Sequence, residues 1–252
     1  MKKKILSLCL VVALAATAII GGTLAYFTDK DQASNTFELG GVDITLTEKK
    51  YENGTWTNIE DPDGTATLGQ LDPVSDDWAK VTAAGYAFNK GVFTINEEDT
   101  AYIRNYVAIE SIGDQTVNNE NVGDIYKIWY NDSAVNNPSE GGKLRHGSVL
   151  TQTFEDVDID DVKYDILVFD TLDNAAVESG DSFMTLTTVT LKEWVTNEMI
   201  EQLGDQFEIY TWSEAIQVSG FADHAEAMTA LIGDDTNLET HATRLLKEVM
   251  GN

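Results

Sequence analysis

The chain has 252 residues and a formal net charge of −27, because 43 Asp and Glu residues outnumber 16 Lys and Arg residues. This charge should repel nucleic acids and anionic membrane surfaces, and it favours cations, cationic cell-wall components or copies of the chain bridged by ions. The charge would also suit a protein that simply needs to stay soluble outside the cell. The single cysteine, Cys9, excludes a fold held by disulfides, so stability must come from a buried core.

Residues 1–25 have the three parts of a secretory signal peptide. Three lysines precede an apolar run at residues 5–20, and two glycines follow it before the small residues Thr23 and Ala25. A signal peptidase binds small residues one and three positions before the cut, so we expect cleavage after Ala25 and a mature protein that begins at Tyr26. The alternative is an uncleaved anchor, because the apolar run lies near the lower length limit for a membrane span.

Residues 26–41 are predicted to form an N-terminal arm. The stretch up to Ser34 is polar and lacks a helical period, which is typical of a flexible segment. Phe27, Phe37 and Leu39 share one parity, as the apolar residues of a strand do. Two glycines then precede a change of parity, so the arm can move independently of the strand that follows.

Residues 42–221 are predicted to form short strands. Val42, Ile44 and Leu46 alternate, and Asn53-Gly54 is a strong hairpin signal within residues 49–59. The run at 164–169, apolar apart from Asp165, predicts a strand buried on both faces. Further strands are expected at residues 87–95, 101–112, 125–130, 149–154, 183–191 and 206–218.

These elements predict an all-β fold, a jelly-roll-like β-sandwich, with a short inserted helix at residues 192–203. The C-terminal segment, residues 222–252, has helical periodicity at 223–231 and again from Thr236, where Glu239 would complete a capping box. The apolar stripe of this last helix must cover either the open end of the sandwich or a neighbouring molecule.

Residues 21–48, GGTLAYFTDKDQASNTFELGGVDITLTE, resemble the N-terminal signature of the TasA/camelysin family. Family members are exported by Gram-positive bacteria through a dedicated signal peptidase, SipW. In TasA-like proteins the arm inserts into the next subunit and builds extracellular fibres of the biofilm matrix. The resemblance implies a secreted subunit located in the matrix or at the cell surface, whose partners are its own copies, a SipW-type peptidase and other matrix or wall components. Phe27, Phe37 and Leu39 would then lie in the donor strand, and the chain would meet a membrane only before cleavage.

The camelysin name also implies metallopeptidase activity, but the residues do not support it. A helical zinc site needs two histidines four residues apart, and the chain has only His146, His224 and His241. A predicted mature chain without cysteine and without a Gly-x-Ser-x-Gly motif also lacks a recognisable nucleophile. We therefore predict no catalytic residues and no enzyme.

An acidic run offers a weak calcium candidate. Asp156, Asp158 and Asp160 alternate as the first ligands of a calcium loop do. Asp161 stands where the turn needs glycine, and Leu167 stands where a bidentate glutamate should be, so an EF-hand is excluded. The alternative is a solvated acidic loop, and no other cofactor is predicted.

Fibre assembly by strand donation is the leading prediction, and two alternatives remain. The first is a monomeric cell-surface or secreted binding module, with Trp56, Trp78 and Trp129 as a platform for glycans, although such aromatic residues also belong to hydrophobic cores. The second is the metallopeptidase that the family name implies.

Overall fold

The structure is a computed structural model that describes residues 28–32, 35–36, 42–53, 55–59, 73–74, 77–111, 126–130, 135–137, 143–196, 201 and 208–251. The predicted signal peptide lies outside these residues, and so do its cleavage positions Thr23, Ala25 and Tyr26. The apolar residues of the predicted donor strand, Phe27, Phe37 and Leu39, also lie outside them.

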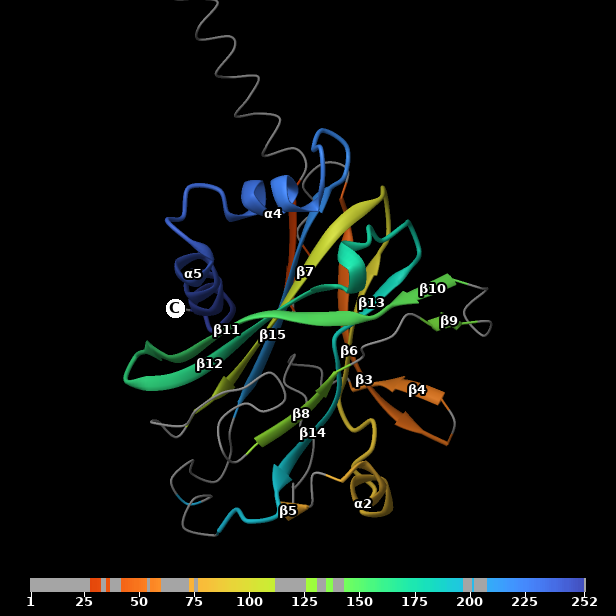
Figure 1. The fold of residues 1–252 in the computed structure, drawn as a ribbon, viewed down its shortest axis with the longest axis vertical. Coiled ribbons are helices and arrows are strands. Elements are labelled where there is room, and N and C mark those ends of the chain that lie inside the picture. Colours follow the sequence, from red (N-terminus) through yellow and green to blue (C-terminus); the bar gives the residue numbers. More distant parts are fainter. Residues whose placement is uncertain are drawn as a thin grey trace, which may run out of the picture.

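The strands form three sheets (Figure 1). Sheet A has six strands in the order β11 (Ser148–Ile159), β12 (Val162–Thr171), β7 (Ala101–Glu110), β15 (Ile209–Gln217), β1 (Thr28–Gln32) and β2 (Asn35–Thr36). Sheet B has six strands in the order β4 (Thr55–Asn58), β3 (Ile44–Glu52), β6 (Gly91–Asn96), β13 (Ser182–Met184), β10 (Lys143–His146) and β9 (Val135–Asn137). Sheet C has three strands in the order β5 (Pro73–Val74), β14 (Leu186–Lys192) and β8 (Tyr126–Tyr130).

One hydrophobic core joins the sheets. It contains Ile44 of β3, Ile103 of β7, Phe169 of β12, Phe183 of β13 and Val189 of β14, all fully buried. Every sheet therefore contributes one face to the same core, and the predicted all-β sandwich is confirmed.

The C-terminal helices cover the outer face of sheet A. They are α4 (His224–Ile232) and α5 (Leu238–Val249), drawn in blue in Figure 1. Leu245 and Leu246 of α5 pack with Tyr106 of β7 and Trp212 of β15 in a second core. The apolar stripe of α5 thus covers a sheet face of its own chain, not the open end of the sandwich.

Local signals located several elements correctly. The hairpin at Asn53 joins β3 and β4, with Tyr51 opposite Trp56. Asn53 has a φ of 53°, the left-handed conformation that this turn requires. Val42, Ile44 and Leu46 are all buried, as their alternation predicts.

Other local predictions were wrong in detail. Residues 183–191 form two strands, β13 and β14, which belong to different sheets and are separated at Thr185. The N-cap of α5 is Asn237, whose Oδ1 accepts the Thr240 N–H at 2.9 Å, and not Thr236. Two short helices were not predicted, because six or fewer residues show no period: α2 (Trp78–Ala83) and the 3₁₀ helix η2 (Leu172–Asn174). Most of the helix predicted at 192–203 lies outside the described residues.

Candidate functional site

The N-terminal arm lies at an edge of sheet A. Strand β1 pairs antiparallel with β15, from Thr28 opposite Ile216 to Gln32 opposite Trp212. Among the described residues, only the two-residue strand β2 lies beyond β1, and β1 also contacts β3 of sheet B. Part of the predicted flexible arm is therefore a strand, held mainly by a strand that lies far away in sequence.

The register places alternating charges across four strands. Asp170 of β12 stands opposite Arg104 of β7, and Arg104 stands opposite Glu214 of β15. Arg104 holds Asp170 through two hydrogen bonds, of 2.7 Å from Nε and 2.8 Å from Nη2. On the far side of β15, Lys30 of the arm stands opposite Glu214. A slip of one residue would place Asp29 or Asp31 opposite Glu214, so charge favours the observed register.

Glu214 also connects the strand that holds the arm to helix α5. Its Oε2 accepts the Tyr106 hydroxyl at 2.9 Å and lies 2.7 Å from Nε2 of His241. The other ring nitrogen of His241 lies 2.7 Å from Oδ2 of Asp235, which also accepts from Arg244. His241 therefore bridges the two carboxylates through its two ring nitrogens. Since Glu214 and His241 are almost fully buried, this contact fixes α5 on β15.

The three histidines have different neighbours. His146 lies 3.7 Å from Asp181, and burial lowers the pKa of its imidazole. His224 packs edge-on against Tyr102, and burial lowers its pKa as well. Within the described part of the chain, no group of three or more His, Cys, Asp or Glu side chains is arranged to hold a metal ion.

The acidic run forms the hairpin between β11 and β12. Asp160 and Asp161 are its two central residues, with φ values of 53° and 69°, as expected for a type I′ turn. Asp156 lies at a bulge of β11 with a φ of 53°, and Asp158 is exposed and stands opposite Lys163. Turn and bulge geometry therefore accounts for this spacing, and calcium binding by Asp156, Asp158 and Asp160 stays a prediction.

Five aromatic side chains form a row that we call the aromatic strip. Its rings come from β8, α2, the loop after α2, β4 and β3: Trp129, Trp78, Phe88, Trp56 and Tyr51. Successive ring centroids are 4.9 Å apart from Trp129 to Trp78 and 5.5 Å apart from Trp78 to Phe88. Trp56 and Tyr51 each lie 5.7 Å from Phe88. The fold thus brings the three predicted platform tryptophans together.

The backbone around the strip is firmly held. Phe88 has a φ of 59°, rare for a bulky residue, and is fixed by a 2.8 Å hydrogen bond from its N–H to Thr188 Oγ1. The Asn89 amide bonds both the N–H and the C=O of Val189, at 2.9 and 2.8 Å. Gly91 lacks the Cβ that would lie 2.5 Å from the Trp56 ring. The strip is therefore largely preorganised.

Comparison with known proteins identifies the N-terminal part of the chain. A family model described as camelysin metallo-endopeptidase matches residues 1–55. The matched segment is similar to the camelysin family, and it covers 55 of the 252 residues. It includes the arm, β3 and the start of the β3–β4 hairpin, so the family signature covers the strand that pairs with β15. No curated protein and no solved structure matches the chain. No helix among the described residues is both long and apolar enough to cross a membrane.

Sequence reasoning missed two features of this camelysin-like chain. The contact between Glu214 and His241 joins residues with no shared motif, and only the helical period around His241 hinted that this side chain faces the protein. Phe88 was predicted to be part of a strand, because an aromatic residue within an apolar run gives no sign of a left-handed backbone.

Proposed function

We propose that this protein is a secreted structural subunit that assembles into extracellular matrix fibres by donating its N-terminal strand to the next subunit. The observation that carries this proposal is the pairing of β1 with β15 at the edge of sheet A. The family match over residues 1–55 supports it, because the arm lies in the matched segment.

The pairing suits exchange between molecules. A strand at a sheet edge is held by backbone hydrogen bonds, which the same segment of a second molecule can form equally well. The charges add a register signal, because Lys30 stands opposite Glu214 while Asp29 and Asp31 flank it. An arm from another copy would meet the same signal. Head-to-tail donation is a heterologous contact, and we propose a rotation between subunits that does not close, which produces a filament and not a ring.

The proposal includes the steps before and after assembly. A SipW-type peptidase would cut after Ala25 and free the arm, and the chain would leave the membrane at that point. The mature protein would then act in the matrix or at the surface of a Gram-positive cell, with its own copies and other matrix components as partners. We propose no peptidase activity, because each histidine has an identified structural neighbour.

Cross-linking can determine whether the arm pairs in trans. Asp31 and Ser213 stand opposite each other, and Cα atoms at such positions are close enough for a disulfide. The only native cysteine, Cys9, lies in the predicted signal peptide, so a mature variant would carry only the introduced thiols. When chains with Asp31→Cys are mixed with chains carrying Ser213→Cys and mildly oxidised, we expect disulfide-linked heterodimers. The double variant should give a ladder of covalent oligomers.

The matched control replaces Ser213→Cys with Val149→Cys. Val149 is exposed on β11, at the opposite edge of sheet A, so it should not cross-link to the arm. If the mixed single variants give no heterodimer and the double variant gives only an internal disulfide, the arm stays in its own chain. Strand donation would then be wrong.

A further inference from the structure

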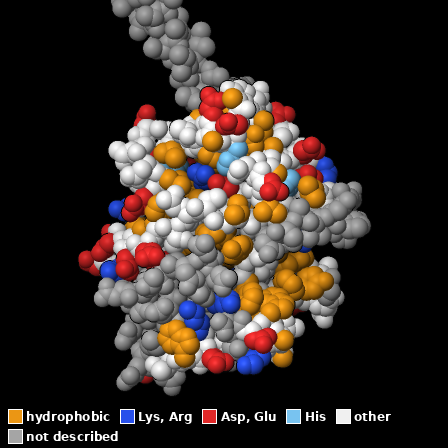
Figure 2. All heavy atoms as spheres, viewed as in Figure 1, with side chains coloured by type: hydrophobic (Ala, Val, Ile, Leu, Met, Phe, Trp, Pro, Cys, Tyr) orange, Lys and Arg blue, Asp and Glu red, His pale blue; other side chains and the backbone are white. Residues whose placement is uncertain are grey.

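The aromatic strip is a second feature that the assembly proposal does not use. Tyr51 is 41% exposed and Trp78 is 36% exposed, while Trp56, Phe88 and Trp129 are half-buried. Figure 2 shows hydrophobic side chains gathered where Figure 1 places β3 and β4. A soluble protein seldom leaves several large rings in contact on its surface unless they bind something.

The arrangement of the rings indicates an extended ligand. The row from Trp129 through Trp78 to Phe88 advances by 4.9 and 5.5 Å. These distances are typical of aromatic rings in contact, so the three rings form one continuous surface. Interplanar angles of 55° and 77° give the row tilted walls, not one flat surface. The apolar C–H faces of sugar rings can pack against such walls one after another.

Preorganisation also favours ligand binding over simple packing. Phe88 keeps a left-handed conformation that costs free energy, and its ring contacts Tyr51, Trp56 and Trp78. The loop that carries Phe88 is bonded to both β3 and β14, through Tyr51 N–H to Phe88 C=O and through Asn89 to Val189. A rigid aromatic surface loses little entropy when a ligand binds.

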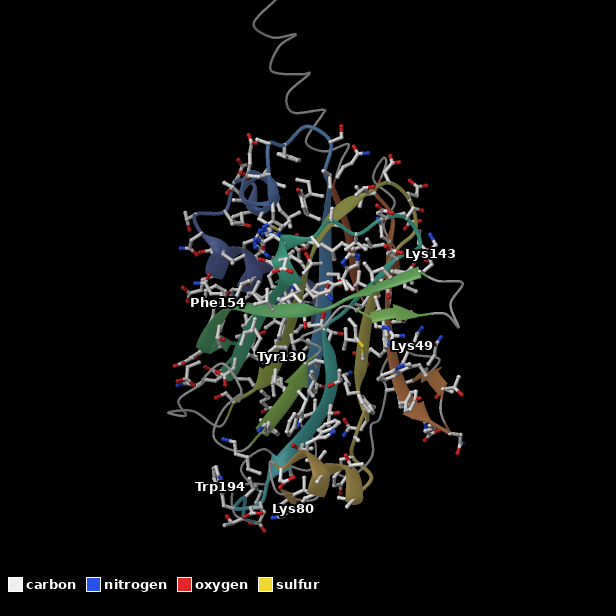
Figure 3. All side chains as sticks on the ribbon, turned by 45° about the vertical axis from the view of Figure 1, so that its right-hand side comes forward. Lys49, Lys80, Tyr130, Lys143, Phe154 and Trp194 are labelled. Carbon is white, nitrogen blue, oxygen red and sulfur yellow. The ribbon has the colours of Figure 1, made fainter. Side chains whose placement is uncertain are left out.

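The charges near the strip differ from those of the whole chain. The elements that carry the strip also carry Lys49, Lys50, Lys80 and Lys127. The ammonium of Lys127 lies 4.3 Å from the centre of the Trp129 ring, and Lys50 pairs with the exposed Glu52 at 3.0 Å. Figure 3 shows Lys49 beside β3 and Lys80 on α2, in the lower half of the molecule. These elements carry four lysines against Glu48 and Glu52, so this part of the surface is less acidic than the chain as a whole, whose net charge is −27.

We propose that the aromatic strip binds an acidic polysaccharide, with sugar faces against the rings and carboxylate groups near Lys127 and Lys49. Rings with adjacent lysines match both halves of such a ligand, its apolar C–H faces and its negative charge. A single-stranded nucleic acid carries a phosphate on every residue and needs a basic groove along its whole length. An acidic polysaccharide also carries one carboxylate on each residue, so an oligo-dT strand is included in the test to separate the two partners.

The test uses polygalacturonate and its fully methyl-esterified form, which share a backbone and differ in charge. Immobilised polygalacturonate should bind the mature protein, measured by biolayer interferometry, and the methyl ester should bind at least tenfold more weakly. Trp78→Ala should weaken binding to polygalacturonate at least tenfold. Lys127→Glu should weaken it while leaving the rings in place, and circular dichroism should show both variants folded.

Trp194→Ala is the matched control. Trp194 is 47% exposed and has Lys192 over its ring at 5.6 Å, but it forms no ring contact with the other described aromatic residues. This variant should bind as the unaltered protein does. Equal binding to the methyl ester, equal binding to an oligo-dT strand, or equal losses in Trp78→Ala and Trp194→Ala would each overturn the proposal. If the unaltered protein binds no polysaccharide and Trp78→Ala abolishes self-association, the proposal is wrong and the strip instead binds a second copy of the chain.

Discussion

Asp165 is a buried carboxyl whose ionisation should destabilise the fold. It lies in β12 opposite Ile109 and is 1% exposed. Its Oδ1 accepts the Asp156 N–H at 3.0 Å, and Oδ2 has no hydrogen-bond partner among the described residues. Burial raises the pKa of this carboxyl from 3.8 to about 6, although the hydrogen bond from Asp156 favours the charged form.

The sign and size of the effect follow from this pKa. Because the folded-state pKa is the higher one, the folded protein holds the proton between pH 3.8 and about 6, and stability falls as the pH rises through that window. The rise in pKa corresponds to a loss of about 3 kcal/mol of unfolding free energy when the carboxyl is ionised. We expect a loss of about 2 kcal/mol, because solvent near the β11–β12 hairpin screens part of the charge. Asp165→Asn keeps the acceptor oxygen and resembles the protonated carboxyl. It should therefore stabilise the protein by about 2 kcal/mol at pH 7.5 and change little at pH 4.

Urea unfolding followed by tryptophan fluorescence, at half-unit steps from pH 4 to pH 8, measures this difference. The control is Asp158→Asn, because Asp158 is exposed in the same hairpin and should change stability by less than about 0.5 kcal/mol at every pH. The reasoning is refuted if the advantage of Asp165→Asn is the same at pH 4 and pH 7.5, or if the native protein is the more stable one at pH 7.5.

Four further predictions concern the arm, the helices and the strip. His241→Ala should lower the free energy of unfolding, measured with a chemical denaturant, by about 3 kcal/mol, because it leaves Glu214 and Asp235 without their shared partner. His224→Ala should lower it by less. Lys30→Glu places like charges opposite each other and should weaken arm pairing by about 1 kcal/mol, seen as faster hydrogen exchange in β15, while Lys30→Arg should not. Gly91→Ala should displace the Trp56 ring, lower the free energy of unfolding by about 1 to 3 kcal/mol and change the tryptophan fluorescence spectrum. An unchanged spectrum would contradict the packing described above. Mature protein should show no zinc-dependent cleavage of an unstructured substrate, and cleavage that His224→Ala abolishes would contradict this prediction.

The sequence by itself determined the features that depend on neighbouring residues. Alternation at Val42, Ile44 and Leu46 reports the buried face of one strand, since side chains of a strand alternate between its faces. Asn53-Gly54 specified a hairpin because its turn needs left-handed residues. The helical periods at residues 223–231 and after Thr236 predicted both C-terminal helices. The N-terminal signature likewise indicated the family, because the order of its residues is enough to recognise it.

Only the tertiary structure decided which of these elements meet. Residues 183–191 form one continuous strand-like pattern, yet they divide between two sheets, because strand order depends on partners elsewhere in the chain. Periodicity placed Glu214 in a strand and His241 in a helix, but the packing of α5 on sheet A brought them to 2.7 Å. The aromatic strip joins rings from four separate elements and one loop, and a local pattern carries no signal for such contacts. The arm is the clearest case, because the stretch up to Ser34 was predicted to be flexible, whereas the fold pairs β1 with β15, far along the chain.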